Sequence, residues 1–90
     1  TEVNIVISKG KEERNDTSAR THKTLSIDLS AYSSSVEIKI VSNGKTVHSS
    51  MHDPSITPMF SATLSGSGVV SFDIYIDGRK VGTRAINFDN

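Results

Sequence analysis

Residues 69–88, VVSFDIYIDGRKVGTRAINF, decide the fold, because apolar side chains occupy every second position on both sides of an Asp-Gly pair. The alternating positions before the pair are Val70, Phe72, Ile74 and Ile76, and those after it are Val81, Thr83 and Ala85. Asp-Gly favours a two-residue type I′ turn, since both central residues take positive φ, which Gly adopts freely and Asp tolerates. The stretch therefore predicts a β-hairpin with one apolar face.

A turn at Asp77-Gly78 also fixes which residues face each other across this hairpin. The predicted inner pairs are Ile76 with Arg79, Ile74 with Val81, Phe72 with Thr83, and Val70 with Ala85. The predicted outer face holds Ser71, Asp73 and Tyr75 opposite Arg84, Gly82 and Lys80. Ile86 and Phe88 fall out of phase with this alternation, which indicates a β-bulge near Ala85 or a last strand that is covered on both faces.

The composition favours a single all-β domain over residues 1–90. Val and Ile supply 17 residues and Leu only three, and eight Thr raise the β-branched total to 25. Such residues suit a pleated sheet better than a helix. A chain of this length buries roughly 60 to 65% of its unfolded surface in one core, which leaves no room for a second.

Charge and cysteine content exclude several classes of function. Ten basic and ten acidic residues balance, so no net field draws the chain to nucleic acid or to an anionic membrane. The absence of Cys removes disulfides, thiolate metal sites and a Cys nucleophile. No apolar run approaches the length of a membrane span and no signal peptide is visible. Because the chain begins at Thr1, we expect a processed form or a piece of a longer polypeptide.

Seven strands follow from the alternation along the chain, at residues 2–8, 24–29, 35–42, 45–50, 59–65, 69–76 and 79–88. Asn43-Gly44 gives a second strong hairpin signal. The predicted pairs across that hairpin are Ile40 with Val47, Ile38 with Ser49, Val36 with Met51, and Lys39 with His48. This register makes His48 an outward-facing neighbour of Lys39 and not a ligand.

The remaining segments are predicted connections. Lys9 to His22 contains one apolar residue in 14 and is expected to be a loop, which is either disordered or solvated, or else functional. Met51 to Pro58 holds both prolines and forms a crossing loop. Gly44 and Gly78 are predicted to need positive φ, so Gly→Val is expected to cost far more at these turns than at Gly66 or Gly68.

Short alternating strands with a turn every 8 to 12 residues are typical of a seven-stranded antiparallel β-sandwich. In strand number and spacing the whole chain resembles an immunoglobulin-like or fibronectin type III-like module. It lacks the paired Cys and the Trp of those families, so the resemblance carries over no functional residue. It implies a module of the kind found in bacterial surface proteins, adhesins and phage tail or capsid proteins.

Residues that bear chemistry do not form a recognisable catalytic or metal motif. The cluster of His48, Ser49, Ser50, His52 and Asp53 lacks a nucleophile elbow and any established zinc spacing, so we expect no enzyme activity, metal or cofactor. The six aspartates lack the one-on, one-off spacing of a calcium loop. Without Trp, the stacking platform of many sugar-binding modules is thin, and glycan binding is disfavoured.

A candidate binding surface follows from the direction of the strands. In a fully antiparallel sandwich the turns after the second, fourth and sixth strands gather at one end, which brings together Tyr32, His52, Asp53 and Arg79. Aromatic residues and arginine often anchor interfaces. The leading hypothesis is a non-catalytic spacer or protein-binding module of a larger extracellular, cell-surface or virion assembly, which binds a protein or neighbouring domains. The alternative is a small secreted protease inhibitor that presents Met51 to Met59 or Lys9 to His22.

Overall fold

The computed structural model describes residues 3–9 and 21–89, and these form seven β-strands and no helix. In chain order the strands are β1 (Asn4–Lys9), β2 (Thr21–Asp28), β3 (Val36–Ser42), β4 (Lys45–His52), β5 (Met59–Gly66), β6 (Val69–Ile76) and β7 (Arg79–Asn87). All seven predicted strands are confirmed, and no boundary differs by more than three residues. The described residues thus include no helix that could cross a membrane.

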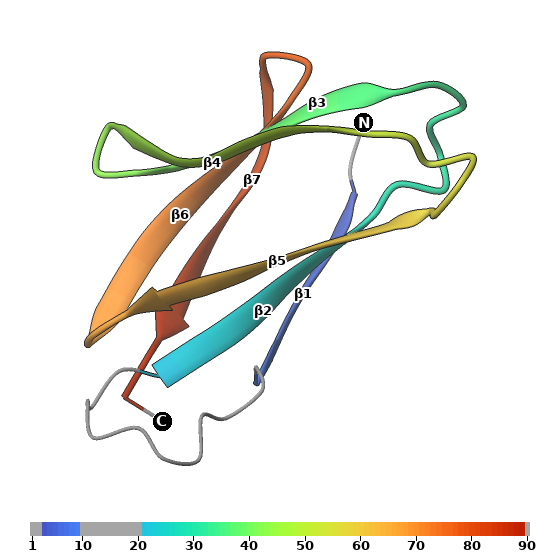
Figure 1. The fold of residues 1–90 in the computed structure, drawn as a ribbon. Helices are drawn as coiled ribbons and strands as arrows, with labels where there is room; N and C mark the ends of the chain where they lie inside the picture. The colour runs from blue at the N-terminus through green and yellow to red at the C-terminus, as the bar shows by residue number, and fades with distance from the viewer. Residues whose placement is uncertain (1–2, 10–20, 90) are drawn as a thin grey trace.

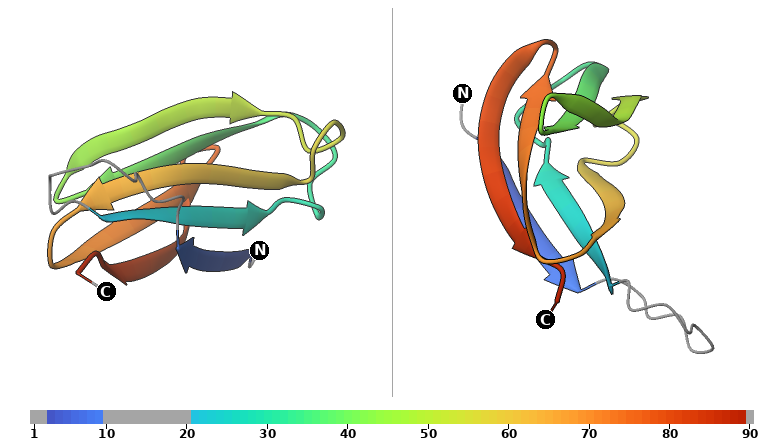
Figure 2. Two further views of the ribbon diagram at one scale, coloured as in Figure 1. Left: turned by 60° about the horizontal axis from the view of Figure 1, so that its bottom comes forward. Right: turned by 90° about the vertical axis from the view of Figure 1, so that its left-hand side faces the viewer.

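Two antiparallel sheets make up the fold (Figure 1). One has the strand order β1-β2-β5 and the other the order β4-β3-β6-β7. The buried core contains side chains from both sheets, among them Leu25 of β2, Phe60 of β5 and Ile74 of β6. Figure 2 shows the strands of both sheets running along the long axis of the molecule. The seven antiparallel strands are therefore organised around one core.

The predicted loop from Lys9 to His22 is shorter than the alternation indicated. Lys9 belongs to β1 and pairs with Lys23, while Thr21 and His22 open β2 and pair with Gly66 and Ser65. The strand β2 begins early because β5 extends to Gly66 and offers partners for these residues. The rest of the predicted loop, residues 10–20, lies outside the described residues.

Both predicted hairpin turns have the backbone of a type I′ turn. The φ angles are 53° at Asn43 and 75° at Gly44, and 52° at Asp77 and 81° at Gly78. Positive φ at both central residues is the condition for this turn type, whose twist matches that of the flanking strands. The turn assignments are confirmed.

The predicted inner register of the β6–β7 hairpin is wrong beyond the first pair, because a bulge occurs earlier than expected. Ile76 faces Arg79 as predicted. Val81 then has no partner, and the following pairs are Ile74 with Gly82, Phe72 with Arg84, and Val70 with Ile86. The bulge at Val81, four positions before Ala85, turns Ile86 and Phe88 into the core, where both are buried.

The predicted register of the β3–β4 hairpin is wrong for the same reason. Val47 is the extra residue, and the pairs beyond it are Ile40 with His48, Lys39 with Ser49, Ile38 with Ser50, Glu37 with Met51, and Val36 with His52. Residues directly opposite share a face of the sheet. His48 therefore lies on the core side with Ile40, and the prediction that it faces outward beside Lys39 is incorrect.

The two bulged hairpins are alike in sequence as well as in shape. Asn43-Gly44-Lys-Thr-Val47 corresponds to Asp77-Gly78-Arg-Lys-Val81, and in each the bulge is the third residue after the glycine. The residue after each bulge faces the core. It is His48 in β4, whose ring packs against Phe60 at a centroid distance of 5.4 Å, and Gly82 in β7.

Gly82 marks a close approach of β7 to β1. A Cβ atom at this position would lie 2.9 Å from Cδ1 of Ile5, which is closer than side-chain carbons come in practice. Ile5 is itself buried and belongs to the other sheet. The missing side chain at position 82 thus makes the space that Ile5 fills.

Substitution by Val was predicted to cost far less at Gly66 and Gly68 than at Gly44 and Gly78, but the structure shows a constraint at each of these two glycines as well. Gly68 has φ of 67°, in the left-handed region that disfavours β-branched side chains. At Gly66 an added Cβ would lie 3.1 Å from Cδ2 of Phe88, a fully buried ring. The turn between β5 and β6 is therefore constrained by conformation at one glycine and by packing at the other.

Candidate functional site

The turns that follow β2, β4 and β6 lie at the same end of the molecule, as the alternation of strand direction predicts. Leu29 N–H donates to the carbonyl of Pro58 at 2.8 Å, which joins the first turn to the second. Glu37 N–H donates to Asp77 Oδ1 and Asp77 N–H donates to the Glu37 carbonyl, both at 2.9 Å. We call this surface the loop end and define it as residues 30–35, 53–58 and 77–79.

Tyr32 and Arg79 share a surface hollow at the loop end. Tyr32 N–H donates to the Leu29 carbonyl at 2.9 Å, which closes a tight turn and lays the Tyr32 ring against the core. The hollow has a volume of about 260 Å³ and is lined by Tyr32, Ile76, Asp77, Arg79 and Val81. Its lining thus joins an aromatic ring, a carboxylate and an exposed guanidinium, with apolar Ile76 and Val81.

His52 lies at the base of the neighbouring turn and not in the hollow. The last residue of β4, it faces the core side like Val36, its partner in β3. Its Nε2 lies 2.6 Å from the Thr57 carbonyl, so the ring donates this hydrogen bond, and its centroid lies 5.5 Å from that of Phe60. The side chain predicted to contact a partner holds residues 53–57 onto the core.

Asp53 stabilises the same turn through hydrogen bonds to residues within it. Its Oδ1 accepts hydrogen bonds from Ser55 Oγ at 2.7 Å and from Ser55 N–H at 3.0 Å. Its carbonyl accepts from the N–H groups of Ile56 and Thr57 at 3.2 and 3.3 Å. The hydrogen bond from the Ser55 hydroxyl, followed by that from its N–H and by the nearby His52, lowers the pKa of the Asp53 carboxyl. The turn is therefore ordered while Asp53 is ionised.

Ile56 is the most exposed large apolar side chain in the described part of the chain, at 79%. It sits in the turn that Asp53 and His52 order, and exposed methionines flank that turn, with Met51 at 66% and Met59 at 45%. The sequence signal was available in MHDPSITPM, where three large apolar residues surround two prolines in a segment with no alternation. These residues were not among the predicted contact residues.

A second carboxylate near the loop end has a lowered pKa. Asp28, the last residue of β2, accepts a hydrogen bond from Ser30 N–H at 3.0 Å. This backbone hydrogen bond, and then one from the Ser30 side chain, lowers the pKa of Asp28. Asp28 and Asp53 thus perform the same local task, since each ties a carboxylate to a serine two residues later at the start of a turn.

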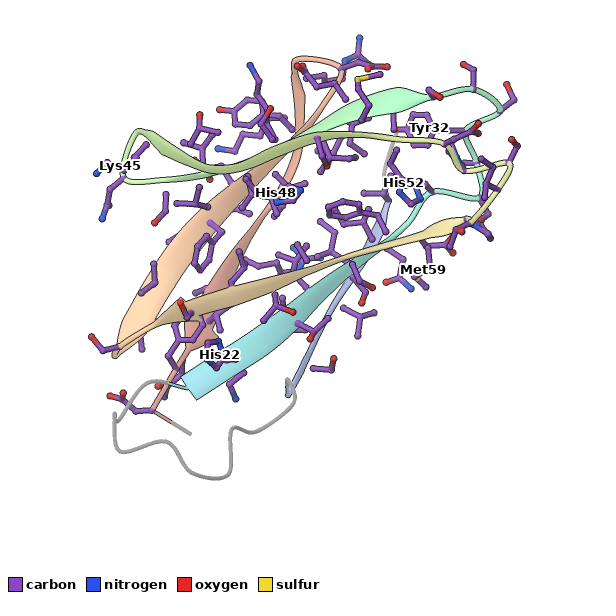
Figure 3. All side chains as sticks on the ribbon, in the orientation of Figure 1. His22, Tyr32, Lys45, His48, His52 and Met59 are labelled. Atoms are coloured by element: carbon purple, nitrogen blue, oxygen red, sulfur yellow. The ribbon has the colours of Figure 1, made fainter. Side chains whose placement is uncertain are left out.

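His48 and Ser50 form a hydrogen-bonded pair on the core side of β4. Nε2 of His48 lies 2.9 Å from Oγ of Ser50, and the His48 ring packs edge-on against Phe60. Figure 3 shows His48 and His52 on the same strand, with His52 and Met59 nearer the loop end that also holds Tyr32. In the described residues no group of three or more His, Asp or Glu side chains is placed to hold a metal ion.

The structure thus brings together only two of the four predicted contact residues as surface groups. Tyr32 and Arg79 line one hollow, whereas His52 and Asp53 stabilise the turn beside it. A scan against protein-family models and searches of curated proteins and of solved structures found no match for this chain. The geometry of the loop end is therefore the basis of the proposal that follows.

Proposed function

We propose that the protein is a non-catalytic, immunoglobulin-like β-sandwich module that binds a protein partner through its loop end. The sheet orders β1-β2-β5 and β4-β3-β6-β7, with core side chains from both, support the sandwich. The partner is another protein or a neighbouring domain of a larger extracellular, cell-surface or virion assembly. Fold class alone would not favour this function.

The observation that carries the proposal is a hydrogen-bonded turn that keeps Ile56 in water. Exposing a large apolar side chain gives the isolated chain no stability, whereas burying one against a partner is worth about 1.5–3 kcal/mol. Methionine, aromatic residues and arginine are also enriched at protein interfaces. Met51 and Met59 flank Ile56, and the hollow with Tyr32 and Arg79 lies at the same end.

Because the turn is already fixed by hydrogen bonds before binding, a contact made by Ile56 can have a higher affinity. Ordering a flexible side chain or loop costs free energy on binding, and a surface that is already fixed avoids that cost. Residues 53–57 are fixed by bonds to Asp53 and His52, and Pro54 within them is buried. Ile56 is therefore presented by a preorganised turn.

The test combines capture with two variants. Photo-crosslinking groups placed at position 56 should capture a partner from an extract of the source cells or virions, and the same group at exposed Val69 should not. Against that partner, Ile56→Ser with Arg79→Ala should weaken binding by more than about 2 kcal/mol, a loss of roughly 30-fold. The midpoint of chemical unfolding should stay unchanged, because both side chains are exposed.

Two results would contradict the proposal. One is undiminished affinity of the double variant. The other is a contact footprint confined to the outer face of the four-stranded sheet, where Tyr75 lies between Lys39 and Lys80. Arg84 was predicted to lie on that outer face, but it pairs with Phe72 and so lies on the opposite face of the sheet. A contact at Arg84 would therefore not report binding to the outer face.

A protease inhibitor is the second candidate, because the turn from Asp53 to Thr57 is rigid and exposes an aliphatic side chain. It ranks second because a protease binds its substrate as an extended chain, and here the Asp53 carbonyl closes a helical turn around Ile56. Inhibition of peptidases that prefer aliphatic residues, lost on Ile56→Ser but kept on Arg79→Ala, would favour it over the module.

A further inference from the structure

We propose that β5 is a docking edge at which two copies of this chain pair, to form a continuous six-stranded sheet. β5 ends the three-stranded sheet, with β2 on one side and no hydrogen-bonded strand on the other among the described residues. Every second residue of an edge strand has a backbone N–H and C=O that form no hydrogen bond within the sheet. A second extended strand can form these hydrogen bonds. The proposal is independent of the loop end.

The sequence of β5 lacks the features that keep edge strands apart. Met59–Gly66 reads MFSATLSG, eight residues with no charge and no proline. Its pairing with β2 runs over all eight residues without a register shift, so no bulge bends the edge away. Charged residues, prolines and bulges are the usual means by which natural proteins block edge pairing.

The other edge strands of the described fold are less suited to self-pairing. β7 carries Arg79, Lys80 and Arg84 together with the bulge at Val81. β4 begins with Lys45 and is bulged at Val47. β1 is shorter, at six residues, and ends in Lys9. A like-charge contact across a twofold axis destabilises pairing, and β5 avoids it.

The alternation along β5 is self-complementary, so a second copy fits this edge with apolar residues opposite apolar residues, and we place the twofold axis at Ala62 near the middle of the strand. In an antiparallel pair, residues directly opposite each other share a face. A twofold axis at Ala62 places Phe60 opposite Leu64 of the other copy, and all three residues are buried on the core side. Exposed Ser61 then faces exposed Thr63, a hydroxyl contact like that between Ser26 and Ser61 at 3.1 Å.

The association should be weak. One pair of strands buries less than the roughly 1,000 Å² that a stable interface needs, so dimerisation is expected only toward the upper end of a concentration series from about 10 µM to about 1 mM. Sedimentation velocity on the wild-type chain should show this shift. Hydrogen exchange at the β5 amides should slow as concentration rises, while exchange at the β7 amides stays constant.

Three double variants test the edge and its register. Ser61→Lys with Thr63→Lys places two Lys–Lys contacts across the axis and should raise the dissociation constant by more than about tenfold. Thr24→Lys with Ser26→Lys is the control. It adds the same charge to the same face of the sheet, but on β2 instead of the edge strand β5, so dimerisation should persist. Ser61→Lys with Thr63→Glu places Lys opposite Glu twice and should restore pairing, which no neighbouring register would allow.

A wild-type chain that stays monomeric throughout the concentration series would overturn the proposal. So would dimers that survive Ser61→Lys with Thr63→Lys, or concentration-dependent protection of β7 amides in place of β5 amides. Circular dichroism of each variant shows whether it is folded. The exchange measurement on the wild-type chain decides the question even if a variant does not fold.

Discussion

Polar side chains in and next to the loop end act mainly on their own turns. Asp53 binds Ser55, Asp28 binds Ser30, and His52 binds Thr57, each within five residues along the chain. Short polar side chains that bond to nearby backbone groups are common at turns. Residue type and loop position therefore predicted that His52 and Asp53 lie at this end of the molecule, but not that His52 belongs to β4 or what the two side chains contact.

Acid should loosen the turn at Asp53. Its carboxyl has a pKa below the usual value, mainly because the Ser55 hydroxyl donates to the ionised form. A lowered folded-state pKa means that the stabilisation is present above the unfolded pKa and is lost as the pH falls through the folded value. An NMR titration should find this low pKa, and the protection factors of the Ile56 and Thr57 amides, which allow for the slower intrinsic exchange of amides in acid, should fall at lower pH.

Ser55→Ala provides the comparison. It removes the hydroxyl donor and leaves the backbone donor, so the pKa of Asp53 should move back toward its usual value. The pKa of Asp28, which depends on Ser30, should not change. A normal pKa at Asp53 in the presence of Ser55 would contradict the expectation.

Among the elements, the two hairpins show where alternation succeeds and where it fails. The Asn-Gly and Asp-Gly turns were predictable because their φ requirement restricts the residue types. The bulges were not located, since the residues after each turn fit a regular ladder equally well: Val47 and Val81 are apolar and fall in phase with it. A single bulge reverses the face of every later residue, and this placed His48 and Arg84 on the wrong sides.

Deleting each bulge residue should show how much of its contribution to the free energy of unfolding comes from the bulge itself and how much from side-chain packing. Removal of Val47 or Val81 would leave a regular ladder with all later pairs unchanged. Val47 is 45% exposed, so its loss should change stability by no more than about 0.5 kcal/mol. Val81 packs against the core, and its deletion should cost about 1–2 kcal/mol more. Urea unfolding gives both values.

The later pairs provide a second readout for the same variants. In the chain without Val47, NMR spectra should still show nuclear Overhauser cross-peaks between the rings of His48 and His52 and the ring of Phe60. Loss of these contacts would mean that β4 has shifted its register, and equal destabilisation by both deletions would contradict the packing argument.

On the scale of the whole molecule, the last described residues close the core. Phe88 lies just beyond β7 and is fully buried; its ring packs edge-on against Phe72 at 6.0 Å. Its N–H donates to the Gly68 carbonyl at 2.8 Å, which ties the chain to the turn between β5 and β6. The composition predicted a single core, but the alternation left the position of Phe88 open.

Phe88→Ala should destabilise the whole fold. Loss of a buried phenylalanine costs about 3–5 kcal/mol through the lost transfer free energy and the cavity left behind. This is a large part of the total stability of a small domain. Val69→Ala, at a position 69% exposed, is the matched control and should stay within about 0.5 kcal/mol.

Thermal and urea unfolding, each followed by circular dichroism, would measure both changes. If Phe88→Ala lowers the free energy of unfolding no more than Val69→Ala does, Phe88 does not contribute to the stability of the core.

Two pairings of strands far apart in the sequence, β2 with β5 and β3 with β6, limit how fast this chain can fold. The two hairpins join neighbouring residues and form in roughly 1–10 µs, whereas β2 must find a strand on the far side of both β3 and β4, with Thr21 beside Gly66 and Asp28 beside Met59. Closing so long a loop costs entropy before any contact compensates for it, which slows folding. Until β2 reaches β5 and β3 reaches β6, the sheets that cover the apolar faces of the hairpins are incomplete, so the period in which newly made chains can misassemble lasts until both pairings have formed.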